Sequence, residues 1–102
     1  MSTVTAVQRE ALRLGVDSTA LWWLSFCDGS LPKGSQWLGA CIVHAETFLD
    51  AVRVAHRLGC NPGGQVAGGE IPAVTHWLIR DGECGRLLSR DEANAFNTRK
   101  RS

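Results

Sequence analysis

The sequence predicts a small α+β domain in which one helix crosses a small antiparallel sheet. Two runs rich in aromatic and aliphatic residues, 21–27 and 37–44, have the composition of strands. The segment over 46–58 is amphipathic with the period of a helix. A glycine-rich run over 58–72 follows and holds five of the eleven glycines and two of the three prolines. A chain of 102 residues forms one domain, so we expect residues 1–102 to fold as a unit.

Composition excludes several classes of function. The net charge is +1 and charged residues make up 21% of the chain, so no strong field points to bulk nucleic acid or a membrane surface. Gln8, Arg9 and Arg13 stand where a secretory signal needs an apolar core, and no apolar run approaches the about 20 residues of a membrane span. We therefore expect a cytoplasmic protein whose four widely spaced cysteines are thiols.

The N-terminal part is predicted to be a short helix followed by the first strand. Thr5 can cap a helix over 5–14, and Gly15 can end it. Alternate residues of the strand over 21–27 point to opposite sides of a sheet. One side carries Trp22, Leu24 and Phe26, and the other carries Leu21, Trp23, Ser25 and Cys27. Because both sides are largely apolar, this strand is central or is covered by a partner.

The next segments complete a ββαβ core over 20–72. A short loop rich in Gly, Pro and Ser precedes the strand over 37–44, which predicts an antiparallel hairpin. The helix over 46–58 has one apolar stripe, and Gly59 suits the left-handed position that ends a helix. A third strand over 64–71, weakened by glycine, is expected to return beside the first.

The C-terminal segment over 73–97 is predicted to be helical. Its first part, 73–79, can form a short helix whose inward side chains would be Val74, Trp77 and Leu78. The sequence Ser89-Arg90-Asp91-Glu92 is a capping box, which predicts a last helix through about Phe96. Residues 98–102 then form a basic tail that we expect to be solvated.

Common catalytic and metal-binding motifs are missing from the sequence. It contains no CxxC or HxxxH spacing, so we predict no metal site. It contains no GxSxG motif, so we predict no catalytic residue. The glycine run lacks the Gly-Lys-Ser/Thr of a phosphate-binding loop and follows a helix instead of opening one, so no dinucleotide cofactor is predicted.

The tryptophans and the glycine run form the candidate ligand-binding surface. A planar base can stack on an exposed tryptophan, and consecutive glycine amides can form an anion-binding nest, although a plain turn followed by a glycine-rich strand is the simpler explanation of the glycines. Gly63, Gly64, Gly68 and Gly69 should include at least one residue with a positive φ or one packed against an aromatic ring. Glu70 completes the set and could face Asp28 across neighbouring strands. The candidate residues are Trp22, Trp23, Lys33, Asn61, Gly63, Gly64, Gln65 and Glu70.

Part of the sequence resembles a group of small, mostly uncharacterised bacterial and phage proteins. The similarity covers about 22–72, and its most specific part is the Asn-Pro-Gly-Gly segment. It follows the pattern WLSF, PKG, LG, IV, LGCNPGG and EIP. The resemblance implies no reaction, but it implies a phage or prophage setting and hence the host cell cytosol. Phage proteins of similar size include sponges that sequester nucleotide immune signals, which suggests an anti-defence role.

Three functions are compatible with these observations. The leading hypothesis is non-enzymatic binding of an anionic, nucleotide-like small molecule. The alternative is a protein–protein interaction module, such as a phage inhibitor of a host protein. The third is a small nucleotide hydrolase with Glu70 or His44 as the base. A short chain whose strands are apolar on both sides also predicts a homodimer or higher closed assembly.

Overall fold

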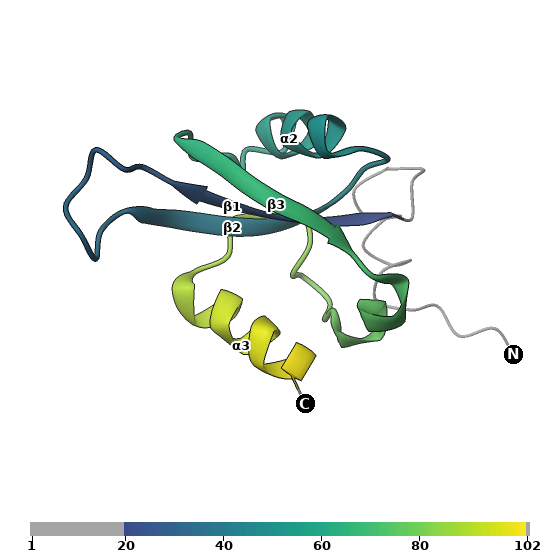
Figure 1. Cartoon of the computed structure of the whole chain (residues 1–102). Coiled ribbons are helices and arrows are strands. Elements are labelled where there is room, and N and C mark those ends of the chain that lie inside the picture. The colour runs from purple at the N-terminus through teal and green to yellow at the C-terminus, as the bar shows by residue number, and fades with distance from the viewer. Residues whose placement is uncertain (1–19, 102) are drawn as a thin grey trace, which may run out of the picture.

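The computed structural model describes residues 20–101, without the side chain of Arg101. The helix predicted over 5–14 lies outside the described residues. The elements confirm a small α+β fold with an antiparallel sheet (Figure 1). In chain order they are β1 (Leu21–Cys27), β2 (Trp37–His44), α2 (Phe48–Arg57), β3 (Gln65–Ile71), the 3₁₀ helix η1 (Ala73–Leu78) and α3 (Arg90–Arg101).

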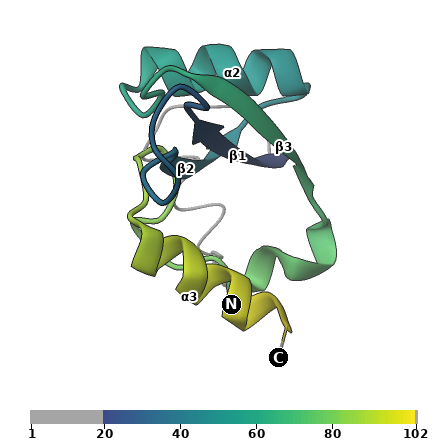
Figure 2. The same ribbon diagram turned by 60° about the vertical axis from the view of Figure 1, so that its left-hand side comes forward.

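The sheet has the strand order β2-β1-β3, so the first strand is central as its two apolar faces predicted. Both neighbours run antiparallel to β1, and Leu21 pairs with His44 on one side and with Ile71 on the other. Helix α2 covers one face and α3 covers the opposite face, which gives three layers (Figure 2). Each apolar face of β1 is therefore covered by a helix of the same chain.

The core on the α2 side forms where small helix residues approach the sheet. Ala51 and Ala55 are fully buried one turn apart and let α2 lie close to the strands. The helix begins at Phe48, where the Oγ1 atom of Thr47 accepts a hydrogen bond of 3.1 Å from the backbone N–H of Asp50. The buried cluster consists of Leu24, Phe26, Cys41, Val43, Ala45, Ala51, Ala55 and Cys60.

The core on the α3 side contains the other set of β1 residues and the segment between η1 and α3. A backbone hydrogen bond of 2.7 Å from Leu88 N to Ala40 O ties this segment to β2. Trp23 packs against the cluster and stacks on Phe96 of α3, with ring centroids 5.3 Å apart. The buried cluster consists of Leu21, Ile42, Ile71, Ile79, Cys84, Leu88 and Phe96.

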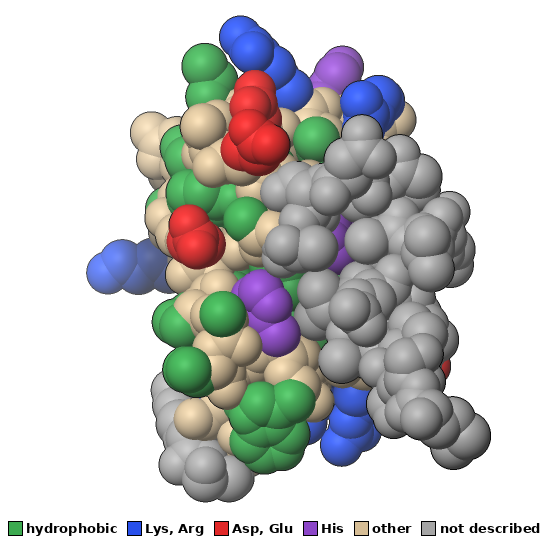
Figure 3. Space-filling view, turned by 90° about the vertical axis from the view of Figure 1, so that its right-hand side faces the viewer, with side chains coloured by type: hydrophobic (Ala, Val, Ile, Leu, Met, Phe, Trp, Pro, Cys, Tyr) green, Lys and Arg blue, Asp and Glu red, His purple; other side chains and the backbone are tan. Residues whose placement is uncertain are grey.

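The inward orientation predicted for Val74 and Trp77 is wrong, whereas Leu78 is half-buried. Val74 and Trp77 are 79% and 78% exposed. In a 3₁₀ helix side chains three positions apart eclipse each other, so both lie on the same side of η1, which here faces solvent. The space-filling view shows hydrophobic side chains exposed at the end of the molecule where η1 lies (Figure 3).

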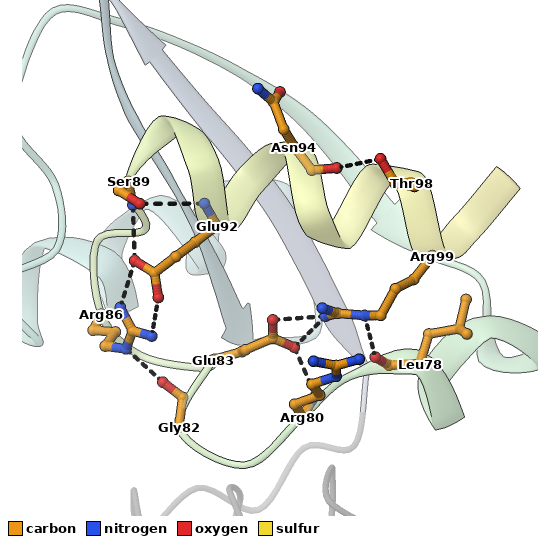
Figure 4. Close-up of polar contacts among 10 residues, drawn as sticks. All are labelled: Leu78, Arg80, Gly82, Glu83, Arg86, Ser89, Glu92, Asn94, Thr98 and Arg99. Carbon is orange, nitrogen blue, oxygen red and sulfur yellow. Dashed lines mark hydrogen bonds and ion pairs between the residues drawn. The ribbon is translucent and has the colours of Figure 1, made fainter. Parts of the chain in front are cut away.

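The predicted basic tail is part of α3, which continues to Arg101. Arg99 is held because its Nη2 atom donates to both carboxylate oxygens of Glu83 at 2.6 Å (Figure 4). Its Nε atom also donates to the carbonyl oxygen of Leu78 at 3.1 Å. The backbone N–H of Arg80 donates to the same carboxylate at 2.6 Å. The side chains of Arg99 and Glu83 are only 16% and 11% exposed, so this largely buried ion pair fixes α3 to the segment that precedes it.

The capping box at the start of α3 is confirmed. The Ser89 Oγ atom accepts a hydrogen bond of 3.2 Å from the Glu92 N–H, and the Glu92 carboxylate accepts one of 3.1 Å from the Ser89 N–H. The guanidinium of Arg86 also binds this carboxylate. The hydrogen bonds from Arg86, and then those from Ser89, lower the pKa of Glu92 from 4.5 to about 2.

Replacing Arg86 with glutamine is expected to raise the pKa of Glu92, while the bond from Ser89 keeps it below 4.5. The carboxylate is stabilised in the folded chain, so its contribution to stability is present above pH 4.5 and is lost as the pH falls toward 2. Carboxyl-carbon NMR titrations of the parent and the variant measure the shift directly. An unchanged pKa in the variant would show that Arg86 does not set it.

No helix among the described residues is long and apolar enough to cross a membrane.

Candidate functional site

The two tryptophans predicted to stack on a ligand lie on opposite faces of the sheet. Trp22 faces α2, where its Nε1–H donates to the carbonyl oxygen of Ala45 at 2.8 Å and its ring lies 6.3 Å from that of Phe48. Trp23 faces α3 and stacks on Phe96 with an interplanar angle of 12°. The opposite faces that the sequence predicted for the two residues are confirmed, so each ring is assessed in its own surroundings.

The glycine run begins as a turn that joins α2 to β3. Gly63 and Gly64 have φ angles of 92° and 75°, which confirms the prediction that some glycines of the run are needed for a positive φ. The N–H of Gly63 donates to the side-chain oxygen of Asn61 at 2.9 Å. This amide is engaged within the turn, and Gln65 already belongs to the exposed start of β3. The geometry favours a turn over an anion-binding nest.

The remaining candidates, Lys33 and Glu70, lie toward opposite ends of the sheet. Lys33 lies in the exposed loop between β1 and β2. Glu70 pairs with Trp22 near one end of β1, whereas Asp28 follows the other end, so the two carboxylates do not face each other. The carboxylate of Asp28 accepts hydrogen bonds from the Oγ and N–H groups of Ser30, which lower its pKa. The predicted set does not converge on one site.

The structure agrees with the prediction of thiols. All four cysteines are free; Cys27 is exposed, and the other three are buried. Cys41 and His44 stand three positions apart on β2 and point to opposite faces, so their spacing does not bring them to one ion. Among residues 20–101, no group of three or more metal-ligating side chains could hold a metal ion.

Side chains do converge in an open groove of about 320 Å³ between the sheet and α3. The sheet contributes Trp23, Ser25 and Trp37, and the helix contributes Arg90, Ala93, Asn94 and Asn97. We call this set the α3 groove. The helix residues recur at intervals of three and four, so they occupy one stripe of α3.

The α3 groove exists because one row of the sheet is small. Ser25 pairs with Ala40 on β2 and with Ala67 on β3, and all three point toward α3. Trp23 precedes this row by two residues on β1, and Trp37 lies one row beyond it on β2. Side chains two residues apart on a strand point to the same face and are about 6.7 Å apart. The rows that hold Trp23 and Trp37 are therefore about 13 Å apart, with only small side chains on the sheet between them.

The polar side chains of the groove come mainly from α3. The Arg90 guanidinium lies 5.4 Å from the centre of the Trp37 ring, at the first residue of the helix. Among residues 20–101, no carboxylate lies within ion-pair distance of Arg90. The side chain of Asn94 points away from the Glu83–Arg99 pair (Figure 4). The groove thus combines aromatic surface, amide groups and one positive charge.

Among the groove residues, Trp23 was predicted from the sequence as a candidate site residue, whereas Arg90, Asn94 and Asn97 were not. A signal for them exists, because the three occupy positions i, i+4 and i+7 of the helix that the capping box predicts. Asparagine is a poor helix former, so two asparagines on one stripe inside a helix suggest a role other than helix stability. The small row was not foreseeable, because it depends on the register of three strands.

No protein-family model, curated protein or solved structure matches the chain.

Proposed function

We propose that the protein binds a planar, anionic small molecule of the nucleotide type in the α3 groove, without transforming it. The observation that carries this proposal is the convergence of two tryptophans, two asparagines and one arginine on a groove with a low floor. Aromatic surface with a few convergent polar groups is typical of small-molecule sites. We propose that this binding sequesters a nucleotide signal in the cytosol of a phage host.

The chemistry of the lining supports binding more than catalysis. Its groups are indole, hydroxyl, methyl, carboxamide and guanidinium, which recognise ligands but are poor proton carriers near neutral pH. The two bases considered for a hydrolase lie elsewhere. Glu70 is on the α2 face of β3, and His44 is buried at the end of β2, paired with Leu21.

Replacing Ala67 with leucine is expected to block the α3 groove and abolish ligand retention. Ala67 is exposed and lies beside Ser25 on the α3 face, so the longer side chain enters the low row without disturbing the core. Native mass spectrometry of the full chain after incubation with a low-molecular-weight cell extract measures retention. Glu70→Leu is the matched control, because it adds the same side chain to the opposite face of the same strand. Equal retention by both variants would refute the groove as the site.

A second candidate function is favoured by the exposed surface of η1. Val74 and Trp77 lie together in solvent, and exposed tryptophans are frequent anchors of protein interfaces. In this function the protein is a binding module for a host protein. Trp77→Ser is expected to abolish capture of that protein while leaving small-molecule retention intact. Capture that survives the substitution would refute this role of η1.

We also propose that the chain forms a homodimer through β3. Among the described residues β3 is an edge strand of seven residues, and no proline or lysine interrupts it. Unprotected edge strands readily pair with another chain. Light scattering at micromolar concentration should give at least twice the chain mass, and a monomer would contradict the proposal.

A further inference from the structure

We infer that the ligand of the α3 groove is an adenine nucleotide with a single phosphate. This inference rests on the proposed function and specifies its ligand. Three properties of the groove carry it: the aromatic surface beside the small row, the paired carboxamides of α3, and the single positive charge at the groove's end.

The aromatic surface determines where a base would stack. One side of the Trp23 ring is covered by Phe96, and the groove reaches the part that Phe96 leaves open. Ser25 and its exposed neighbour Ala67 provide room beside that ring because neither side chain extends far from the sheet, while Ala40 at the other end of the row is buried. A base in this position extends the stack that Phe96 and Trp23 already form.

The carboxamides determine which base fits. Asn94 and Asn97 lie three positions apart on the stripe that faces the groove. A carboxamide offers a donor and an acceptor side by side, which matches the N6 donor and N7 acceptor of adenine. Guanine presents two acceptors, O6 and N7, on the same edge and suits the paired donors of an arginine. The pair of asparagines therefore favours adenine.

The charge and the size determine how many phosphates fit. Arg90 is the only ionisable residue among the described residues that line the groove. Its guanidinium rests on Trp37, about 13 Å along the strands from the Trp23 row, and can bind a phosphate through a charge-assisted pair of hydrogen bonds. A volume of about 320 Å³ is at the small end of the range for ligand sites. These features suit one nucleotide and one phosphate.

Calorimetry of the full chain with AMP, GMP, adenosine and ATP tests the inference. AMP is expected to bind about tenfold more tightly than GMP, because a bidentate amide contact discriminates by about this factor. Adenosine and ATP are expected to bind more weakly than AMP. Asn94→Ala and Asn97→Ala should remove the preference for AMP over GMP. Alanine is the better helix former, so lost discrimination is not explained by an unfolded helix.

Arg90→Gln should reduce the affinity for AMP to that for adenosine. Arg57→Gln is the matched control, because Arg57 is an exposed arginine at the end of α2, on the other face of the sheet. This control should preserve the difference between AMP and adenosine. It makes the test specific for the charge at the groove and not for the charge of the whole protein.

Two adverse outcomes separate this inference from the proposed function. GMP binding as tightly as AMP, with Ala67→Leu abolishing that binding, would overturn the adenine assignment and leave the groove as the site. No binding of any of these probes, or binding that Ala67→Leu leaves unchanged, would overturn both.

Discussion

Replacing Arg99 with alanine is expected to destabilise the domain by about 3 kcal/mol, because it breaks a buried ion pair. Arg99 joins α3 to Glu83 and to the carbonyl oxygen of Leu78. Without it, a carboxylate that is only 11% exposed loses its guanidinium partner and keeps only the hydrogen bond from the backbone N–H of Arg80. The free energy of unfolding from denaturant titration measures the loss.

Two variants show whether burial is the cause of this effect. Arg86→Ala removes an ion pair whose side chains are 48% and 38% exposed, so solvent screens it and the variant should lose much less stability than Arg99→Ala. In the double variant Glu83→Leu, Arg99→Met, no buried charge is left unpaired, and much of the lost stability should return. A loss with Arg99→Ala no larger than that with Arg86→Ala would contradict the buried-pair account.

Gly68→Ala is expected to cost about 2–3 kcal/mol, the second large effect. A Cβ atom at this position would lie 1.9 Å from the carbonyl oxygen of Trp23, which belongs to the central strand. Backbone on β1 or β3 must shift to relieve this contact, and the pairing between the two strands weakens. Thermal and denaturant unfolding of the variant measure the change.

The adjacent Gly69→Ala variant is the matched control. A Cβ atom on Gly69 would meet no atom within 4 Å, so alanine fits without strain. It should raise stability by about 0.5–1 kcal/mol, because alanine loses less chain entropy than glycine in a strand. Equal effects at the two positions would show that close packing of β3 against Trp23 does not explain Gly68.

Much of the fold follows from periodicity and local signals. The alternation of Leu21 to Cys27 correctly predicted two apolar faces, and the order of elements correctly predicted β3 beside β1. The capping box correctly located the start of α3. The end of α3 was placed too early, because nothing near Arg99 in the sequence reveals Glu83 as its buried partner.

The candidate site was harder to predict than the fold. Trp22 and Trp23 were both predicted as stacking candidates, and they lie on the opposite faces that the alternation of the strand predicted. Gly63 and Gly64 were predicted as ligand contacts, whereas their positive φ angles serve the turn into β3. The α3 groove depends on strand register and on which helix covers which face. Both are tertiary properties that a single sequence does not state.

The most direct measurement is a titration of the protein with AMP. The titration is monitored through the indole N–H signals of the four tryptophans in a proton–nitrogen NMR spectrum. Trp23 and Trp37 line the α3 groove, Trp22 faces α2, and Trp77 is exposed on η1. The account predicts that the signals of Trp23 and Trp37 shift with saturation while those of Trp22 and Trp77 stay in place. Saturable shifts confined to Trp22 or Trp77, or no saturable shift of any indole, would contradict it.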